Sequence, residues 1–170
     1  MTLNNTTSVK KVALIGLGRW GTNILKTLDQ IQGVSLTHVV TSQTVDFEFK
    51  NINTLSHWRN LIDLDIDAVF IATPPFTHAS IVEFFIENHI PCFVEKPLCL
   101  DYETALNLKN LALSEKVPVF VDHTQLFQPS FKEIMDFMDI DNVIKINLEG
   151  MGDGPIRKDV SVLWDWGSHD

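Results

Sequence analysis

Three glycines near the N-terminus stand at a spacing typical of phosphate-binding turns. The pattern G-x-G-x-x-G is formed by Gly16, Gly18 and Gly21, directly after the apolar run at residues 12–15. The first glycine permits a tight turn, the second lets a pyrophosphate approach the backbone, and the third lets a helix pack against the strand. The pattern predicts a dinucleotide site, and a glycine turn that binds nothing is the alternative.

The residues that follow this turn predict the helix that such a site requires. Helical spacing is shown by Ile24, Leu25 and Leu28, which would give the helix one buried face. The first turn of a helix carries unpaired N–H groups and the positive end of the helix dipole, and both attract phosphate. The order of strand, glycine turn and helix therefore favours the dinucleotide interpretation.

The end of the next predicted strand bears on which dinucleotide would bind. After Gly33, placed like a helix C-cap, residues 34–40 have the composition of a strand, and Thr41, Ser42 and Gln43 follow. An Asp or Glu at this position binds the ribose hydroxyls of NAD. Hydroxyl and amide groups tolerate a 2′-phosphate better, although no Arg stands beside them. Both NAD and NADP stay open as cofactors, and the missing acid favours NADP.

Further along, apolar runs of strand length alternate with helical patterns. Strands are expected at residues 68–72, 93–94 and 117–121, helices at 76–88 and 101–116, and a short helix capped by Thr54 or Ser56 that ends at residue 62. This alternation predicts an α/β fold, a doubly wound parallel sheet with helices on both faces, over residues 1–122. A helix at 129–138 and a strand at 143–148 predict the start of a second α/β domain over residues 123–170.

Polar residues follow several of these predicted strands. The ligand of an open parallel sheet lies at the carboxyl ends of its strands, so the side chains found there are expected to share one crevice. They are Thr73, His78, Glu95, Lys96, Asp122 and His123.

Composition limits the kinds of partner that the chain could bind. It has 170 residues, a formal net charge of −9 and no basic cluster, which argues against nucleic acid and anionic membranes and favours a small-molecule ligand. The N-terminus lacks a signal-peptide pattern and no apolar run approaches ~18 residues, so a cytoplasmic location is expected. The two cysteines, Cys92 and Cys99, lack metal-ligand spacing, and they are interpreted as reduced packing residues with no metal site.

Four segments together resemble the Gfo/Idh/MocA oxidoreductase family. They are IGLGRWGTN, IATPPFTH, FVEKPL and LWDWGSHD, in the family's order and at similar spacing, so the resemblance covers residues 12–170. It implies a Rossmann domain followed by an α/β domain that carries substrate and subunit contacts. The closing run GPIRKDVSVLWDWGSHD looks closest to the branch that contains UDP-N-acetylglucosamine 3-dehydrogenases.

The resemblance implies a catalytic set. Lys96 matches the family's active-site lysine, which hydrogen-bonds the reacting hydroxyl, and a cis bond to Pro97 is implied as well. A cation beside an alcohol lowers the cost of developing alkoxide character. The D-x-x-x-H pair is matched by Asp165 and His169, where a histidine would take the hydroxyl proton and the carboxylate would orient its ring. The alternatives are a solvated lysine, a helix-start Asp and a surface His.

The resemblance also implies the contacts of the cofactor. His78 looks like a cofactor-side histidine, with a first-turn helix residue as the alternative, and Trp20 would offer its backbone N–H while its ring, like those of Trp58, Trp164 and Trp166, packs. The full set of expected cofactor contacts is Gly16, Gly18, Arg19, Trp20, Gly21, Thr41, Ser42, Thr73, Pro74, His78, Glu95 and Lys96.

Two functions follow from the resemblance. The first is an NAD(P)-dependent dehydrogenase acting on a sugar or cyclitol hydroxyl, and the second is a dinucleotide-binding regulatory module without catalysis. Family members have about twice this length, so the second domain is expected to be incomplete and a full-length form to be a homo-oligomer. The 170-residue chain alone is expected to bind cofactor without turnover, because Asp165 and His169 would lack the domain that holds them near Lys96.

Overall fold

A six-stranded parallel sheet forms the centre of the computed structural model, which describes residues 8–42, 51–145, 147, 149, 160–165 and 167. The strand order is β3-β2-β1-β4-β5-β6, and every neighbouring pair is parallel. The strands are β1 (Lys10–Ile15), β2 (Val34–Val40), β3 (Asn53–Leu55), β4 (Ala68–Ile71), β5 (Cys92–Glu95) and β6 (Val119–Asp122). The chain reverses direction across the sheet between β1 and β4, which is the topological switch point of a Rossmann fold.

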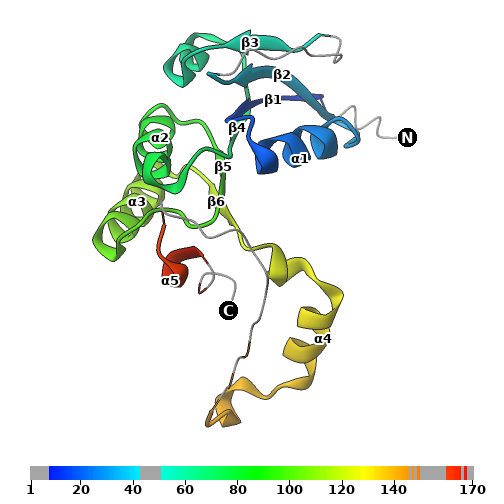
Figure 1. Cartoon of the computed structure of the whole chain (residues 1–170), viewed down its shortest axis with the longest axis vertical. Helices are drawn as coiled ribbons and strands as arrows, with labels where there is room; N and C mark the ends of the chain where they lie inside the picture. Colours follow the sequence, from blue (N-terminus) through cyan, green and yellow to red (C-terminus); the bar gives the residue numbers. More distant parts are fainter. Residues whose placement is uncertain are drawn as a thin grey trace, which may run out of the picture.

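Helices cover both faces of this sheet (Figure 1). The α-helices are α1 (Arg19–Leu28), α2 (Pro75–Glu87), α3 (Tyr102–Glu115), α4 (Pro129–Phe137) and α5 (Val162–Asp165), and the 3-10 helices are η1 (Trp58–Asp63), η2 (Thr124–Phe127) and η3 (Ile140–Asn142). On one face, Leu25 of α1 packs with Leu14 and Val39. The other face packs against α2 and α3, as the strand and helix pattern predicts.

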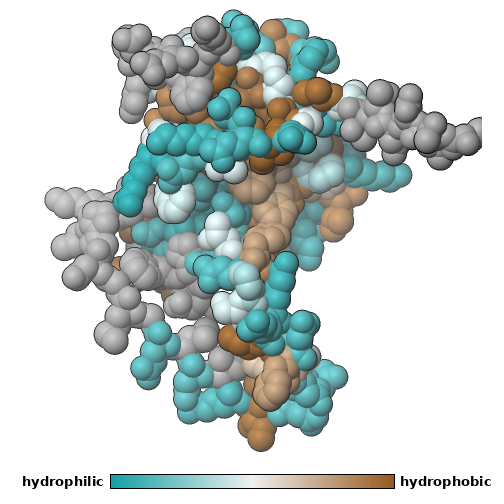
Figure 2. Space-filling model, turned by 90° about the vertical axis from the view of Figure 1, so that its right-hand side faces the viewer, coloured by the Kyte–Doolittle hydropathy of each residue, from teal (hydrophilic) through white to brown (hydrophobic). Residues whose placement is uncertain are grey.

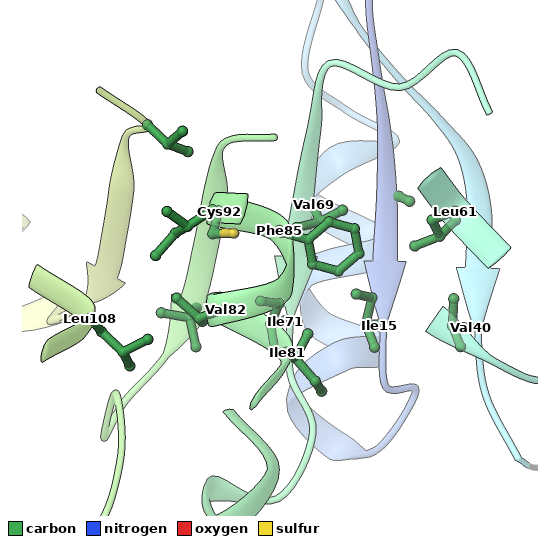
Figure 3. Close-up of a cluster of buried hydrophobic side chains, with 14 residues drawn as sticks. Ile15, Val40, Leu61, Val69, Ile71, Ile81, Val82, Phe85, Cys92 and Leu108 are labelled. Carbon is green, nitrogen blue, oxygen red and sulfur yellow. The ribbon is translucent and has the colours of Figure 1, made fainter. Parts of the chain in front are cut away.

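The larger core lies between the sheet and α2 (Figure 3). Ile15, Val69 and Ile71 contribute from neighbouring strands, and Phe85 of α2 is fully buried among them. Because successive side chains of a strand alternate between faces, Leu14 and Ile15 serve the two different cores. This two-sided burial explains why the β1 sequence is a continuous apolar run.

The helix boundaries agree with the sequence prediction except near β3. Helix α3 begins after Asp101, whose side chain accepts a hydrogen bond from the backbone N–H of Thr104, 2.8 Å away. The predicted cap at Thr54 or Ser56 is wrong, because Asn53–Leu55 pairs with β2 as a strand. His57 caps η1 instead, accepting from the backbone N–H of Arg59 at 3.2 Å.

The predicted strand at residues 143–148 is absent at residues 143–145, which have no regular structure, while residues 146 and 148 lie outside the described residues. A strand needs a hydrogen-bonded neighbour, and among the described residues none lies beside this segment.

A row of phenylalanines crosses the sheet on the face opposite α2 and α3. Ring centroids lie 5.0 Å apart for Phe70 and Phe93, 5.1 Å for Phe93 and Phe120, and 5.7 Å for Phe120 and Phe127. Phe120 is 41% exposed and Phe127 is 56% exposed, and hydrophobic atoms run along the middle of the side view in Figure 2. Phe70 at one end of the row also packs against the core cluster that contains Leu25 of α1, and Phe127 at the other end belongs to η2.

Candidate functional site

The glycine turn joins β1 to α1 at the carboxyl edge of the sheet. Gly16 has a φ of +95°, and a Cβ added there would lie 2.6 Å from the carbonyl oxygen of Ala72. A Cβ on Gly21 would collide with the carbonyl oxygen of Gly16, whereas one on Gly18 would meet nothing within 4 Å. Two glycines therefore make close backbone packing possible, and the third leaves open space above the turn.

The N-terminus of α1 opens onto that space. Gly18 is the N-cap and offers no side-chain hydrogen bond, and helical bonding begins with the N–H of Thr22 donating to the Gly18 carbonyl over 2.9 Å. The first N–H groups of the helix are therefore available to an anion. Arg19 is exposed, and so is Trp20 at 57%, so the expected packing of the Trp20 ring is wrong. Backbone donors, a nearby cation and an open position at Gly18 fit a dinucleotide pyrophosphate.

The ends of β4 and β2 flank the glycine turn. Thr73 follows β4 and lies against Gly16, since a Cβ on Gly16 would come within 3.0 Å of its Cγ2 atom. Pro74 caps α2 without a side-chain bond. On the other side, the N–H of Thr41 donates to the carbonyl of Leu55 over 3.0 Å, which fixes the end of β2 beside β3. Thr41 and Ser42 occupy the position where NAD-binding proteins carry an acid.

Lys96 meets Asp165 at this same edge. The Lys96 Nζ atom donates to the Asp165 backbone carbonyl at 2.8 Å and to its Oδ1 atom at 2.9 Å. The two side chains are only 12% and 16% exposed, so they form a largely buried ion pair between residues 69 positions apart. The expectation that this chain cannot hold Asp165 near Lys96 is therefore wrong. His169 lies outside the described residues.

Glu95 precedes this lysine and stands opposite another carboxylate. In the register of β5 and β6, Glu95 is paired with Asp122. Burial raises the pKa of Glu95 to about 7, the charge of Asp122 adds to the rise, and Lys96 opposes it. A carboxyl group that titrates near neutrality beside a buried cation is a feature of functional sites.

His78 is placed inside the fold. The ring is fully buried, with Nδ1 lying 2.8 Å from the Pro97 carbonyl oxygen and Nε2 lying 2.7 Å from that of Thr73. Both nitrogens face protein atoms, so a direct contact with a cofactor is not open to this ring. Burial lowers the pKa of His78, and the two carbonyls raise it by a smaller amount. The first-turn position was visible in the sequence, but burial under the turn at Pro97 was not.

Other features give little evidence of a second site. The predicted cis peptide bond between Lys96 and Pro97 is present. Cys92 and Cys99 are free and buried, in agreement with their interpretation as packing residues. Among the described residues, no group of three or more metal-ligating side chains is placed to hold a metal ion. No helix in the described ranges is long and apolar enough to span a membrane.

The fold and the edge residues define a dinucleotide-binding protein of the Rossmann class. Residues 10–123 match a family model described as an oxidoreductase family with an NAD-binding Rossmann fold. The chain therefore belongs to the Gfo/Idh/MocA oxidoreductase family, as its four motifs predict.

Three similar proteins illustrate the range of the family. An inositol 2-dehydrogenase from Rhizobium meliloti is 35% identical over 75 residues, which are 44% of this chain and 23% of that protein. A UDP-N-acetylglucosamine 3-dehydrogenase from Acidithiobacillus ferrooxidans is 31% identical over 68 residues, 40% of this chain and 22% of that protein. The crystal structure of an oxidoreductase from Magnetospirillum magnetotacticum superimposes with a TM-score of 0.80 and 34% identity, over 95% of this chain and 54% of that one. The chain thus spans about half of that structure, and the matches cover less than a quarter of the two dehydrogenases named above.

The three glycines predict different consequences of substitution. Gly18→Val should abolish dinucleotide binding while the free energy of unfolding changes by less than about 1 kcal/mol, because the added side chain enters only the open phosphate position. Gly21→Val should destabilise the fold by about 2–3 kcal/mol, because its side chain meets backbone. Calorimetric titration with NADH and NADPH, together with urea unfolding, tests both variants. Wild-type affinity in Gly18→Val would contradict the assignment.

The raised pKa of Glu95 predicts a pH dependence of stability. The folded protein holds the Glu95 proton up to about pH 7 and the unfolded chain only to about 4.5, so Glu95 contributes stability that is lost as pH rises between these values. Allowing for partial exposure, we expect the difference in unfolding free energy between wild type and Glu95→Gln to fall by about 1 kcal/mol from pH 4.5 to pH 8. Urea unfolding across this range measures it, with Glu133→Gln on exposed α4 as the control. A difference independent of pH would contradict the assigned environment.

Proposed function

We propose that this protein is an NAD(P)-dependent oxidoreductase that transfers hydride between nicotinamide and a hydroxyl-bearing carbon of a sugar or cyclitol. The observation that carries the proposal is the buried pair of Lys96 and Asp165 at the carboxyl edge that also holds the glycine turn. A site that only binds a dinucleotide would not require a desolvated lysine with a carboxylate partner beside it.

The glycine turn and the strand ends beside it indicate how each residue would contact the cofactor. Backbone N–H groups of Arg19, Trp20 and Gly21 would hold the pyrophosphate, and Thr41 and Ser42 would face the adenosine ribose. A bound nicotinamide supplies the position that accepts or returns the hydride. The family description supports NAD binding. The hydroxyls at Thr41 and Ser42, in place of an acid, favour NADP, and this preference is part of the proposal.

The chemistry rests on the charge of Lys96. A substrate hydroxyl near its Nζ atom would develop alkoxide character as the carbon loses hydride, and the ammonium group stabilises that charge. Asp165 holds Nζ through two hydrogen bonds, so the cation is oriented before substrate binds. His169 is the proposed base that removes the hydroxyl proton.

Relatives support a polyol as the substrate class. One similar protein is named an inositol 2-dehydrogenase and another a UDP-N-acetylglucosamine 3-dehydrogenase. Both names describe oxidation of a secondary alcohol on a six-membered ring that carries several hydroxyls. We propose the same substrate class here, with a homo-oligomer as the active form.

A regulatory module is the second candidate. The phosphate position at Gly18 would serve a dinucleotide sensor equally well, since the geometry of the glycine turn is independent of Lys96. The two candidates differ in one measurable property, because a sensor binds the dinucleotide without turnover.

Lys96→Ala tests the catalytic assignment. In a full-length form that contains this chain, with myo-inositol, scyllo-inositol or UDP-N-acetylglucosamine, we expect the variant to reduce NAD(P) about a hundredfold more slowly than wild type, because the alkoxide charge loses its partner. Cofactor affinity should change little. Lys109→Ala, an exposed lysine on α3, is the matched control and should retain wild-type rates.

The outcomes separate the candidates. Wild-type turnover in Lys96→Ala would exclude its catalytic role. Tight cofactor binding by the full-length wild type without turnover of any substrate in the panel would favour the regulatory module.

A further inference from the structure

His78 connects two segments that carry the site. We propose that it is a positioning residue whose two ring nitrogens tether the turn after Lys96 to the end of β4. The inference rests on the proposed function, since it concerns the same site, but it assigns to His78 a role that needs no contact with cofactor or substrate.

The tether joins three separate parts of the chain. His78 belongs to the first turn of α2, and Thr73 follows β4. Pro97 comes directly after Lys96, which is the first residue past β5. The ring contacts main-chain carbonyl oxygens at 2.8 Å and 2.7 Å, so it holds backbone on both sides. Because the ring has no exposed surface, water does not replace either contact.

Proton counting shows what each contact requires. A carbonyl oxygen only accepts hydrogen bonds, and a neutral imidazole has a single N–H to donate. Both contacts are hydrogen bonds at the same time only when both ring nitrogens carry protons. Burial opposes that charge, and the two carbonyls favour it, so the ring holds whichever segment its proton faces and both when doubly protonated.

The two tethered segments are the walls of the site. Thr73 lies against Gly16 of the glycine turn, and Pro97 directly follows the lysine that binds Asp165. The ring therefore spans the distance between the glycine turn and Lys96, and each hydrogen bond that it donates holds the segment on that side. Because a displacement of about 1 Å at a reacting group can cost about a hundredfold in rate, a residue that holds this distance affects chemistry without touching it.

Hydrogen exchange on the cofactor-free chain tests the tether. His78→Gln retains a donor for one carbonyl, and His78→Phe retains the ring shape without any donor. We expect backbone exchange in the peptide covering residues 95–99 to speed up by about tenfold in His78→Phe and by less in His78→Gln, as for a lost hydrogen bond. The peptide covering β1 should exchange at the wild-type rate in both variants.

Val82→Ala is the matched control. It removes a fully buried apolar group from the same helix, so it should speed exchange throughout the domain and not at residues 95–99 alone. If both His78 variants show either unchanged exchange at residues 95–99 or only the uniform increase of Val82→Ala, the tether is overturned and His78 is a packing residue.

Cofactor titration separates this inference from the proposed function. If wild type binds NADH or NADPH, His78→Phe should bind about tenfold more weakly and His78→Gln should lose less affinity, whereas His89→Gln, at an exposed histidine just past α2, should bind normally. If wild type binds neither dinucleotide, the proposed function fails, while local exchange at residues 95–99 still decides whether the tether exists.

Discussion

The arrangement of the site depends on close backbone packing between the glycine turn and the end of β4. Gly16 lies against the Ala72 carbonyl, and Gly21 lies against the carbonyl of Gly16, with no room for a side chain at either position. This contact fixes the start of α1 over the carboxyl ends of β1 and β4. Thr41, Thr73 and Lys96 are placed relative to it, because they follow strands of the same parallel sheet.

Much of the fold follows from local patterns in the sequence. Strand β1 is buried on both faces and therefore apolar throughout, and Asp101 combines a capping side chain with a helical pattern after it. Strand β3 was missed because its three residues, Asn53–Leu55, have no apolar run, and the pairing that makes them a strand comes from β2. The exposure of the Trp20 ring is also not predicted by the sequence, since an aromatic residue at the start of a helix can lie on either its buried or its exposed face.

The site was predictable residue by residue but not as a geometry. The motif at Glu95 and Lys96 and the pair at residues 165 and 169 indicate roles through resemblance, yet no spacing shows that a chain segment 69 residues away reaches Lys96. The interior position of His78 depends on the turn at Pro97, which lies in another motif. Contacts of this kind arise from tertiary packing, which a local pattern does not record.

Two titratable groups within this edge are partly or fully removed from water. Glu95 of β5 is paired with Asp122 on the neighbouring strand β6, and the His78 ring lies against two backbone carbonyls. Burial disfavours the charged form of each group, which raises the pKa of Glu95 and lowers that of His78. Such groups are costly to keep in a fold, and their presence around Lys96 is what a site built for proton and hydride chemistry would contain.

The proposed function requires a nicotinamide dinucleotide to bind at the carboxyl edge, between the glycine turn and Lys96. Backbone amide NMR of the labelled chain during titration with NADPH locates the binding site. The largest shifts are expected at Gly18, Arg19, Thr73 and Lys96, the residues at the glycine turn and at the ends of β4 and β5. Saturable shifts gathered at the opposite edge, around Lys10 and Ala68, or no shift at the glycine turn, would contradict it.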